Sequence, residues 1–171
     1  MSMSNLPEEL EKYIYEFVNG IPYDTIDDQG CRICGYKNSH GEFHGRCKTW
    51  FEDGMLHRDS NYESGKLHGD CMEWSEEGRL MCVVGFKGGV LHGKLKEWFE
   101  GGQIRFQCNN KDGEFHGECK TWFENGTLQR DSNYVDGEFC GEYKEWSEDG
   151  ELLFFVNYKD GCGSPVDMLS Y

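Results

Sequence analysis

The sequence predicts an all-β fold, an elongated open antiparallel β-hairpin repeat solenoid built as a single twisted sheet, with a short N-terminal capping α-helix. Three observations predict it. Glycine and tryptophan recur every 24 residues, without an insertion, in five copies. Asp-Gly and Asn-Gly pairs end the strand-like runs, and such pairs favour hairpins because glycine accepts a positive φ. Proline is absent between Tyr23 and Ser164, which suits a continuous sheet because proline removes a ladder hydrogen bond.

Residues 1–22 do not follow the repeat and are predicted to form the capping helix. Asn5 can cap its N-terminus, and Pro7 suits its first turn. The helix would carry an apolar stripe and would cover the exposed first hairpin, because the ends of a solenoid need caps. The stripe consists of Leu6, Leu10, Tyr13, Ile14, Phe17 and Val18.

The repeats begin after a degenerate half repeat at residues 23–40. In that segment Gly30 is in register, while Ile26 stands at the tryptophan position. Residues 41–163 hold five repeats of 24 residues, and residues 164–171 form a C-terminal tail. The tryptophans of the five repeats are Trp50, Trp74, Trp98, Trp122 and Trp146.

Each repeat is predicted to be one hairpin. In the first repeat, residues 45–51 form one strand, Glu-Asp-Gly54 forms the turn, and residues 55–62 form the return strand. Two strands spaced roughly 4.8 Å apart give about 10 Å per repeat, so the whole array predicts a rod roughly 50–60 Å long. A single repeat cannot bury its own face, so stacking against its neighbours is the source of stability.

The pattern Gly-x-x-His-Gly-x-x-x-x-Trp-x-x-x-Gly-x-Leu-x-x-x-x-x-Tyr-x-x-Gly resembles the MORN repeat over residues 24–163. It is most similar to the longer variant found in bacterial antitoxin-like proteins and in large DNA viruses. The resemblance implies an open solenoid that serves as an interaction, assembly or membrane-proximal scaffold and is not an enzyme. It also implies two further alternatives, membrane-lipid binding and toxin neutralisation.

The run Leu-Pro-x-Glu-Leu-x-x-Tyr-Ile-x-x-Phe near the N-terminus resembles the first helix of an F-box, which docks substrate receptors onto cullin-type ubiquitin ligases. The resemblance implies an alternative function as an F-box-like substrate adaptor. A whole F-box is longer than the segment that precedes the repeats, so the cap is the favoured interpretation. The implied adaptor-docking residues are Leu6, Pro7, Leu10, Ile14 and Phe17.

The charge of the chain restricts its partners. Lys+Arg is 17 and Asp+Glu is 32, so the net charge is −15. This excludes general nucleic-acid binding, which needs a basic surface, and disfavours adsorption to anionic membranes. A protein partner is expected, and acidic hairpin tips suit a basic one, although such tips also serve solubility alone. The tips are Glu52-Asp53, Glu76-Glu77 and Glu148-Asp149.

Nine cysteines are expected to be reduced thiols, since neither a secretory leader nor an apolar run of membrane length is recognisable. The expected location is therefore the cytoplasm, that of the host if the protein is viral.

Zinc at Cys31-x-x-Cys34 is disfavoured, because residues three apart on a strand point to opposite faces. Histidines recur about 10 Å apart, too far to share an ion, and are expected to bond the backbone of the turns. No cofactor, metal or catalytic residue is predicted, because an active site should break the repeat symmetry.

The tryptophan row is the candidate protein-binding site. A lysine precedes four of the five tryptophans by two residues and thus lies on the same side of the strand. Tryptophan beside lysine permits cation–π contacts or stacking of a ligand. The alternative, that the rings form the core of the curved face, stays open. An unpaired end strand also invites a homodimer. The lysines are Lys48, Lys96, Lys120 and Lys144.

Overall fold

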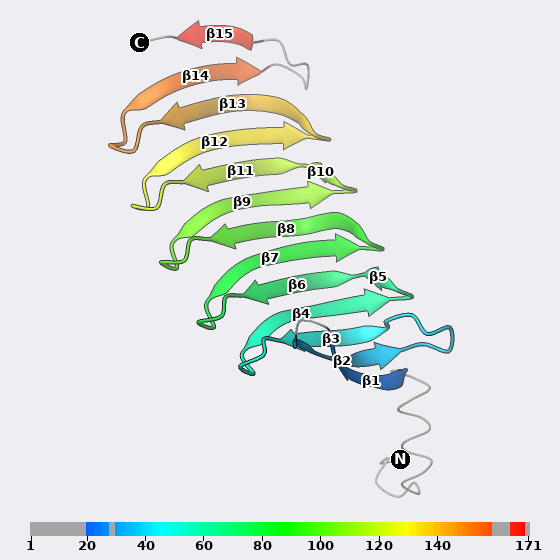
Figure 1. Cartoon of the computed structure of the whole chain (residues 1–171). Helices are drawn as coiled ribbons and strands as arrows, with labels where there is room; N and C mark the ends of the chain where they lie inside the picture. The colour runs from blue at the N-terminus through cyan, green and yellow to red at the C-terminus, as the bar shows by residue number, and fades with distance from the viewer. Residues whose placement is uncertain (1–19, 28–29, 159–164, 170–171) are drawn as a thin grey trace, which may run out of the picture.

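The computed structural model describes residues 20–27, 30–158 and 165–169, which form one antiparallel sheet of 15 strands (Figure 1). The strands are β1 (Ile21–Ile26), β2 (Arg32–Lys37), β3 (Gly45–Trp50), β4 (Leu56–Glu63), β5 (Lys66–Leu67), β6 (Gly69–Trp74), β7 (Leu80–Lys87), β8 (Val90–Trp98), β9 (Ile104–Lys111), β10 (Glu114–Phe115), β11 (Gly117–Trp122), β12 (Leu128–Val135), β13 (Glu138–Trp146), β14 (Leu152–Tyr158) and β15 (Pro165–Leu169). The strands lie side by side in chain order, except that β5 and β10 pair only with β4 and β9. The predicted all-β, open antiparallel solenoid is confirmed.

The capping helix was predicted for residues 1–22, of which 1–19 lie outside the described residues. Ile21 and Pro22 belong to strand β1, so the helix prediction is wrong for the end of that segment, and the part of the chain that is described contains no helix. The segment predicted as a degenerate half repeat, residues 23–40, holds most of β1 and all of β2, which pair from Ile21↔Lys37 to Ile26↔Arg32.

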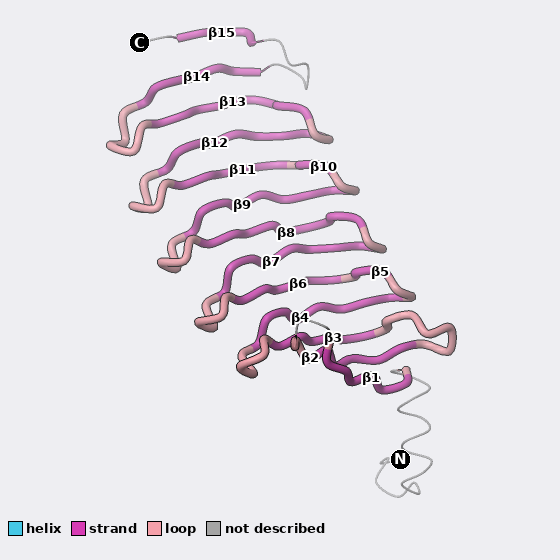
Figure 2. Tube along the Cα trace, viewed as in Figure 1, coloured by secondary structure: helices cyan, strands magenta, loops and turns pink. Residues whose placement is uncertain are grey.

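The turns lie along the two long edges of the sheet, with the five hairpin tips on one edge (Figure 2). In the first tip the backbone N–H of Phe51 donates to the carbonyl of Met55 at 2.8 Å, and Gly54 N–H donates to the carbonyl of Phe51 at 2.9 Å. Gly54 has φ 88°, a left-handed conformation that glycine adopts without a Cβ clash. The same pair of bonds recurs in the other four tips, so the glycine spacing correctly predicted the turns.

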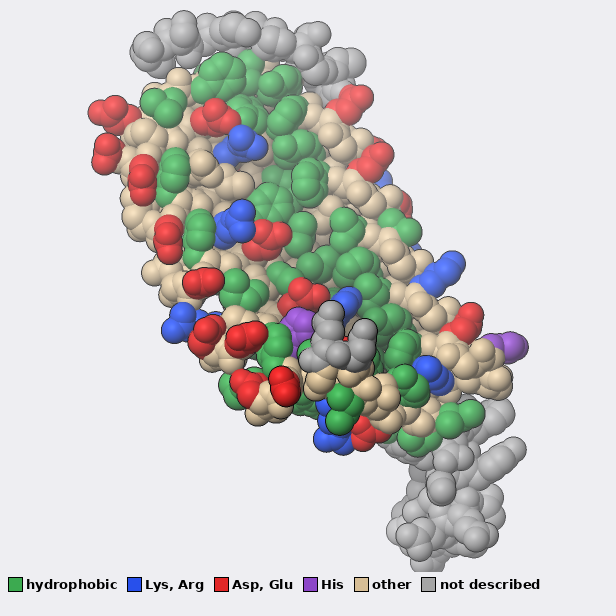
Figure 3. All heavy atoms as spheres, in the orientation of Figure 1, with side chains coloured by type: hydrophobic (Ala, Val, Ile, Leu, Met, Phe, Trp, Pro, Cys, Tyr) green, Lys and Arg blue, Asp and Glu red, His purple; other side chains and the backbone are tan. Residues whose placement is uncertain are grey.

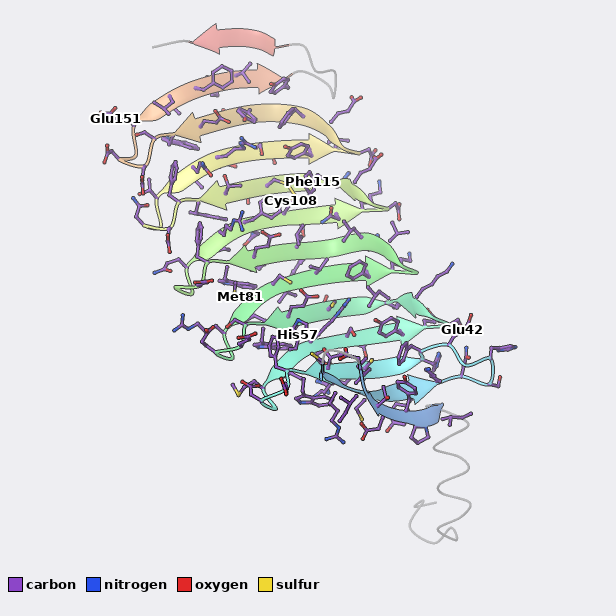
Figure 4. All side chains as sticks on the ribbon, in the orientation of Figure 1. Glu42, His57, Met81, Cys108, Phe115 and Glu151 are labelled. Atoms are coloured by element: carbon purple, nitrogen blue, oxygen red, sulfur yellow. A yellow bond between two sulfur atoms is a disulfide. The ribbon has the colours of Figure 1, made fainter. Side chains whose placement is uncertain are left out.

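A β-bulge follows every tip. Thr49 lies opposite Arg58, but the next pair is Trp50 opposite Leu56, so His57 is left without a cross-strand partner. The same shift occurs beside each of the other four tryptophans. Bulges re-aim side chains locally, and Figure 4 shows His57 and Met81 close to the tips. The bulged residues are His57, Met81, Arg105, Gln129 and Leu153.

The core is a single row in which most side chains are small, and the half-buried tryptophans do not belong to it. Cross-strand register aligns one residue from each strand into this row, which we call the buried row. Its most covered members are 1–5 % exposed. The buried serines are satisfied, because the hydroxyl of Ser132 donates to the carbonyl of Cys119 at 3.1 Å. The row consists of Cys47, Ser60, Cys71, Val84, Leu95, Cys108, Cys119, Ser132, Tyr143 and Val156.

An aromatic row flanks the buried row on the same face of the sheet, which we call the apolar face. Ring centroids lie 5.4 Å apart for Phe115 and Tyr134, 4.6 Å for Tyr134 and Phe139, and 5.1 Å for Phe139 and Tyr158. Figure 3 shows a band of hydrophobic side chains that crosses the strands from end to end of the visible face. The rings therefore cover the small residues beside them in a sheet that has no second layer in the described part.

One cysteine pair departs from expectation. Cys108 of β9 and Cys119 of β11 are neighbours in the buried row, with Cα atoms 4.2 Å apart, and the structure joins them in a disulfide. The expectation that all nine cysteines are free thiols is therefore wrong for this pair. The free cysteines within the described residues are Cys31, Cys34, Cys47, Cys71, Cys82 and Cys140.

A substitution at Gly85 tests how closely neighbouring hairpins approach each other. A Cβ atom at this position would lie 2.2 Å from the backbone oxygen of His92, which cannot move aside without breaking the register. We expect Gly85→Ala to lower the free energy of unfolding by about 3 kcal/mol, because the strand must separate from its neighbour. Urea denaturation measures the loss.

Gly41→Ala is the control for Gly85→Ala. Gly41 has φ 80° and open space where a Cβ would lie, so only the left-handed backbone opposes the change, at about 1–2 kcal/mol. A loss at Gly85 no greater than the loss at Gly41 would contradict the close approach of the strands.

Candidate functional site

The structure brings the four candidate lysines into one row on the face opposite the apolar face. Lys48 lies opposite Asp59, and the register continues across every strand to Lys144 opposite Phe155. Because side chains alternate along a strand, the tryptophans project to the same side as these lysines. We call this surface the Trp–Lys face. The row consists of Lys48, Asp59, Met72, Val83, Lys96, Gln107, Lys120, Asp131, Lys144 and Phe155.

All five tryptophans are half-buried, so each leaves part of its ring accessible. Each lies opposite an aliphatic residue of the return strand, as Trp50 lies opposite Leu56. A cation does lie over one of these rings, since the guanidinium of Arg32 is 5.6 Å from the Trp50 centroid. Within the described residues no lysine lies over a tryptophan, and Lys144 instead lies over Phe155 at 5.4 Å.

Three of the four lysines have carboxylate partners. Lys48 Nζ lies 3.8 Å from Asp59, Lys120 Nζ lies 2.6 Å from Glu118, and Lys144 Nζ lies 2.6 Å from Glu142. Lys96 makes no ion pair within the described part of the chain, because its row neighbours are Val83 and Gln107. Lys96 is thus the lysine of the row whose charge is not already matched.

Asp59 is the most deeply buried charge on this face, at 7 % exposure. Two hydrogen bonds from the Arg46 guanidinium reach its carboxylate, one of them 2.8 Å long from Nε. These bonds, and then the charges of Arg46 and Lys48, hold the pKa of Asp59 below its ordinary value of 3.8, although burial acts in the opposite direction.

The apolar face carries its own ion pairs between successive hairpins. Arg58 Nε lies 3.6 Å from Glu73, and its Nε also donates to the Cys71 sulfur at 3.1 Å. Arg130 lies 3.0 Å from Glu145 in the fourth and fifth repeats. These ion pairs therefore connect neighbouring strands on a face whose other side chains are mostly apolar.

A groove of about 670 Å³ opens near the tips of the third and fourth hairpins. It is lined by Leu95, Glu97, Phe99, Arg105, Phe106, Phe115, Thr121, Trp122, Phe123, Glu124, Gln129 and Glu148. Of these residues the sequence reasoning singled out only Trp122 as a binding residue. A signal for this groove was present in the sequence but was not used. At one repeat position, two repeats carry arginine, Arg58 and Arg130, whereas another carries Cys82.

Two of the four histidines in register, His92 and His116, contact the backbone of a turn, so the prediction is confirmed for these two, whereas His68 contacts the carboxylate of Glu63 instead. His116 Nδ1 lies 3.4 Å from the backbone nitrogen of Asp136 and 3.2 Å from its carboxylate. His92 has the same two contacts with Asp112, both at 3.5 Å. The described residues contain no group of three or more His, Cys, Asp or Glu side chains that could hold a metal ion.

The five adaptor-docking residues, Leu6, Pro7, Leu10, Ile14 and Phe17, lie outside the described residues. Within the described part, no helix has the length and apolar character needed to cross a membrane.

The family model of the MORN repeat variant matches four stretches of the chain, at residues 43–64, 91–112, 115–136 and 139–160. Together they make up just over half of its length, so the chain belongs to the MORN-repeat family. The hairpin of β6 and β7 lies outside the matched stretches but has the same tip bonds and the same bulge. No curated protein matches the chain. MORN repeats are generally non-catalytic modules that bind proteins or membranes.

Asp59→Asn tests the buried charge pair. Removing the carboxylate charge leaves Arg46 poorly paired, so we expect a loss of about 1–3 kcal/mol in the free energy of unfolding at pH 7. A group whose folded pKa is lowered stabilises the fold above its unfolded pKa and loses that effect as the pH falls through its folded pKa. The difference between wild type and variant should therefore shrink below about pH 4. Urea denaturation at pH 7 and pH 3 measures it.

Asp131→Asn is the matched control for Asp59→Asn, because Asp131 occupies the same repeat position, has a side chain 30 % exposed, and pairs with Lys120 at 3.5 Å. We expect it to cost less than Asp59→Asn at pH 7. An equal loss for Asp59→Asn at both pH values would show that packing, and not charge, explains its effect.

Proposed function

We propose that the chain is a non-catalytic protein-interaction scaffold that holds a protein partner along the Trp–Lys face. The observation that carries this proposal is the continuous row of half-buried tryptophans and lysines from β3 to β13, which no other described element covers. Tryptophan is enriched among the residues that dominate binding energies, because a large ring buries much area at little cost in conformational entropy.

We expect the partner to contact the middle of this face. Trp98 and Lys96 lie on the same side of β8, with Val83 beside Lys96. Lys96 is the lysine without an ion pair in the described residues, so a partner carboxylate can bind it without first displacing an internal one. Rim charges of this kind act mainly on specificity and association rate.

Self-association is a second proposal, because β1 is the first strand of the sheet that the described residues form and has exposed apolar side chains. Ile21 and Ile26 are 57 % and 68 % exposed. An unpaired edge offers backbone donors and acceptors to another strand, so a second copy can extend the sheet there. Light scattering during size-exclusion chromatography distinguishes a monomer from a dimer.

The adaptor function depends on residues that the structure does not describe, and it stays a hypothesis. Affinity capture from the native cell with the intact chain and with residues 1–22 deleted tests it. Ligase components recovered with the intact chain but not with the shortened one would support the adaptor function.

Trp98→Ala and Lys96→Ala test the Trp–Lys face. Affinity capture from the native cell identifies the partner, and calorimetry then measures its affinity. We expect Trp98→Ala to abolish measurable binding, since truncation of such a residue costs about 2–4 kcal/mol. We expect Lys96→Ala to weaken binding roughly 5-fold through loss of an interfacial charge pair.

Lys144→Ala is the matched control, because Lys144 is already paired with Glu142; we expect less than a roughly 2-fold effect. Thermal melting checks that each variant is folded. Unchanged affinity for folded Trp98→Ala and Lys96→Ala would overturn the assignment of this face.

A further inference from the structure

The groove near the third and fourth tips holds a carboxylate without a partner. Glu97 is half-buried among apolar side chains of the groove, and it makes no ion pair within the described residues. A partly buried carboxylate is stabilised by a charged hydrogen-bond donor that reaches it. The groove therefore offers an unmatched carboxylate to a cationic group of a partner.

The repeat itself shows which group is missing. Glu73, Glu97 and Glu145 occupy the same position in the second, third and fifth repeats, where the first and fourth repeats carry threonine. The strand that precedes Glu73 places Arg58 directly opposite it, and the strand that precedes Glu145 places Arg130 directly opposite it. Both arginines form ion pairs with these carboxylates.

Opposite Glu97 the arginine is replaced by Cys82. The Cys82 sulfur lies 3.6 Å from the carboxylate of Glu73, and burial, followed by the charge of Glu73, raises the pKa of the thiol to about 12. Cys82 is thus neutral and short. It therefore supplies no positive charge to Glu97, which lies opposite it.

One guanidinium already lies against an aromatic ring that lines the groove. The guanidinium of Arg105 lies 5.9 Å from the ring centroid of Phe99. Phe123 occupies the same position one repeat later, but the residue that corresponds to Arg105 there is Gln129. Phe123 therefore presents a ring with no cation from its own repeat.

The charges that line the groove favour a cation. Glu97, Glu124 and Glu148 contribute three carboxylates against one guanidinium, that of Arg105. Figure 3 shows further acidic side chains along the edge of the sheet where the tips lie. A hydrogen bond from the side-chain amide of Asn125 to the backbone carbonyl of Glu148, at 3.1 Å, joins the fourth tip to the fifth.

We propose that this groove binds an arginine side chain of a basic partner protein, which pairs with Glu97 as Arg58 and Arg130 pair with their own glutamates. The planar guanidinium donates two parallel hydrogen bonds to a carboxylate and stacks on an aromatic ring, whereas a lysine ammonium does only part of this. The inference rests on the proposed function as an interaction scaffold. It adds a contact on the apolar face, where Glu97 lies two residues from Leu95 of the buried row, to the contact proposed for the Trp–Lys face.

Fluorescence anisotropy with the full chain tests the proposal. The probe is a fluorescein-labelled nonapeptide of three Gly-Gly-Arg units, compared at about 0.15 M salt with the same peptide carrying citrulline or lysine. Citrulline keeps the shape of arginine without its charge. We expect saturable binding of the arginine peptide, about 10-fold weaker binding of the citrulline peptide, and intermediate binding of the lysine peptide.

Three variants separate the site from the general acidity of the chain. We expect Glu97→Gln to weaken the arginine peptide about 10-fold. We expect Cys82→Arg to weaken it by a similar factor, because the new internal arginine occupies Glu97, while its melting temperature stays at or above that of the wild type. Glu73→Gln is the matched control, since its carboxylate is already paired with Arg58, and we expect less than a roughly 2-fold change.

Equal affinity for the arginine and citrulline peptides would overturn the proposal. Unchanged affinity of the arginine peptide for folded Glu97→Gln and Cys82→Arg would also overturn it. An equal loss of affinity in Glu73→Gln would show that the general acidity of the chain, and not this groove, binds the peptide. Failure here leaves the scaffold function standing if a captured partner still depends on Trp98. Failure to capture any partner would contradict the scaffold function itself.

Discussion

The register between neighbouring strands is the constraint on which the rest of the structure depends. Each tip closes with its glycine in a left-handed conformation, and each bulge beside a tryptophan removes one residue from the pairing. Because both devices recur in every hairpin, equivalent residues meet across strand after strand and form rows. A slip of one residue would turn every side chain to the opposite face. The buried row, the aromatic row and the Trp–Lys face therefore all depend on these few backbone features.

A single-layer sheet also explains why the core is so thin. Cysteine, serine and Val156 occupy the most buried positions of the row, because large rings beside them exclude water. The most buried serine, Ser132, meets its hydrogen-bonding need at the carbonyl of Cys119. Among the described residues no second layer covers the sheet, so neither face is covered by another described element. In such an architecture, a position where the internal pairing is incomplete, as at Glu97, is a position where a partner can supply the missing group.

The 24-residue spacing predicted the hairpins, the tips and the open solenoid, because those depend on glycine and on local turn chemistry. It did not predict the bulges, since the unpaired residue, such as His57, leaves the spacing of 24 unchanged. The Cys108–Cys119 pair and the unmatched Glu97 depend on which residues lie opposite each other across two repeats, and that follows only from the register. The four lysines were correctly placed on one face, but their ion pairs with Asp59, Glu118 and Glu142 required the structure.

Small-angle X-ray scattering of the full chain in solution tests the open, single-sheet architecture most directly. Thirteen strands side by side, spaced about 4.8 Å apart, extend for roughly 60 Å. We predict a pair-distance distribution that is skewed toward long distances and a radius of gyration clearly above ~15.5 Å, the value for a compact globule of this length. A symmetric distribution with a radius of gyration near ~15.5 Å would contradict the account.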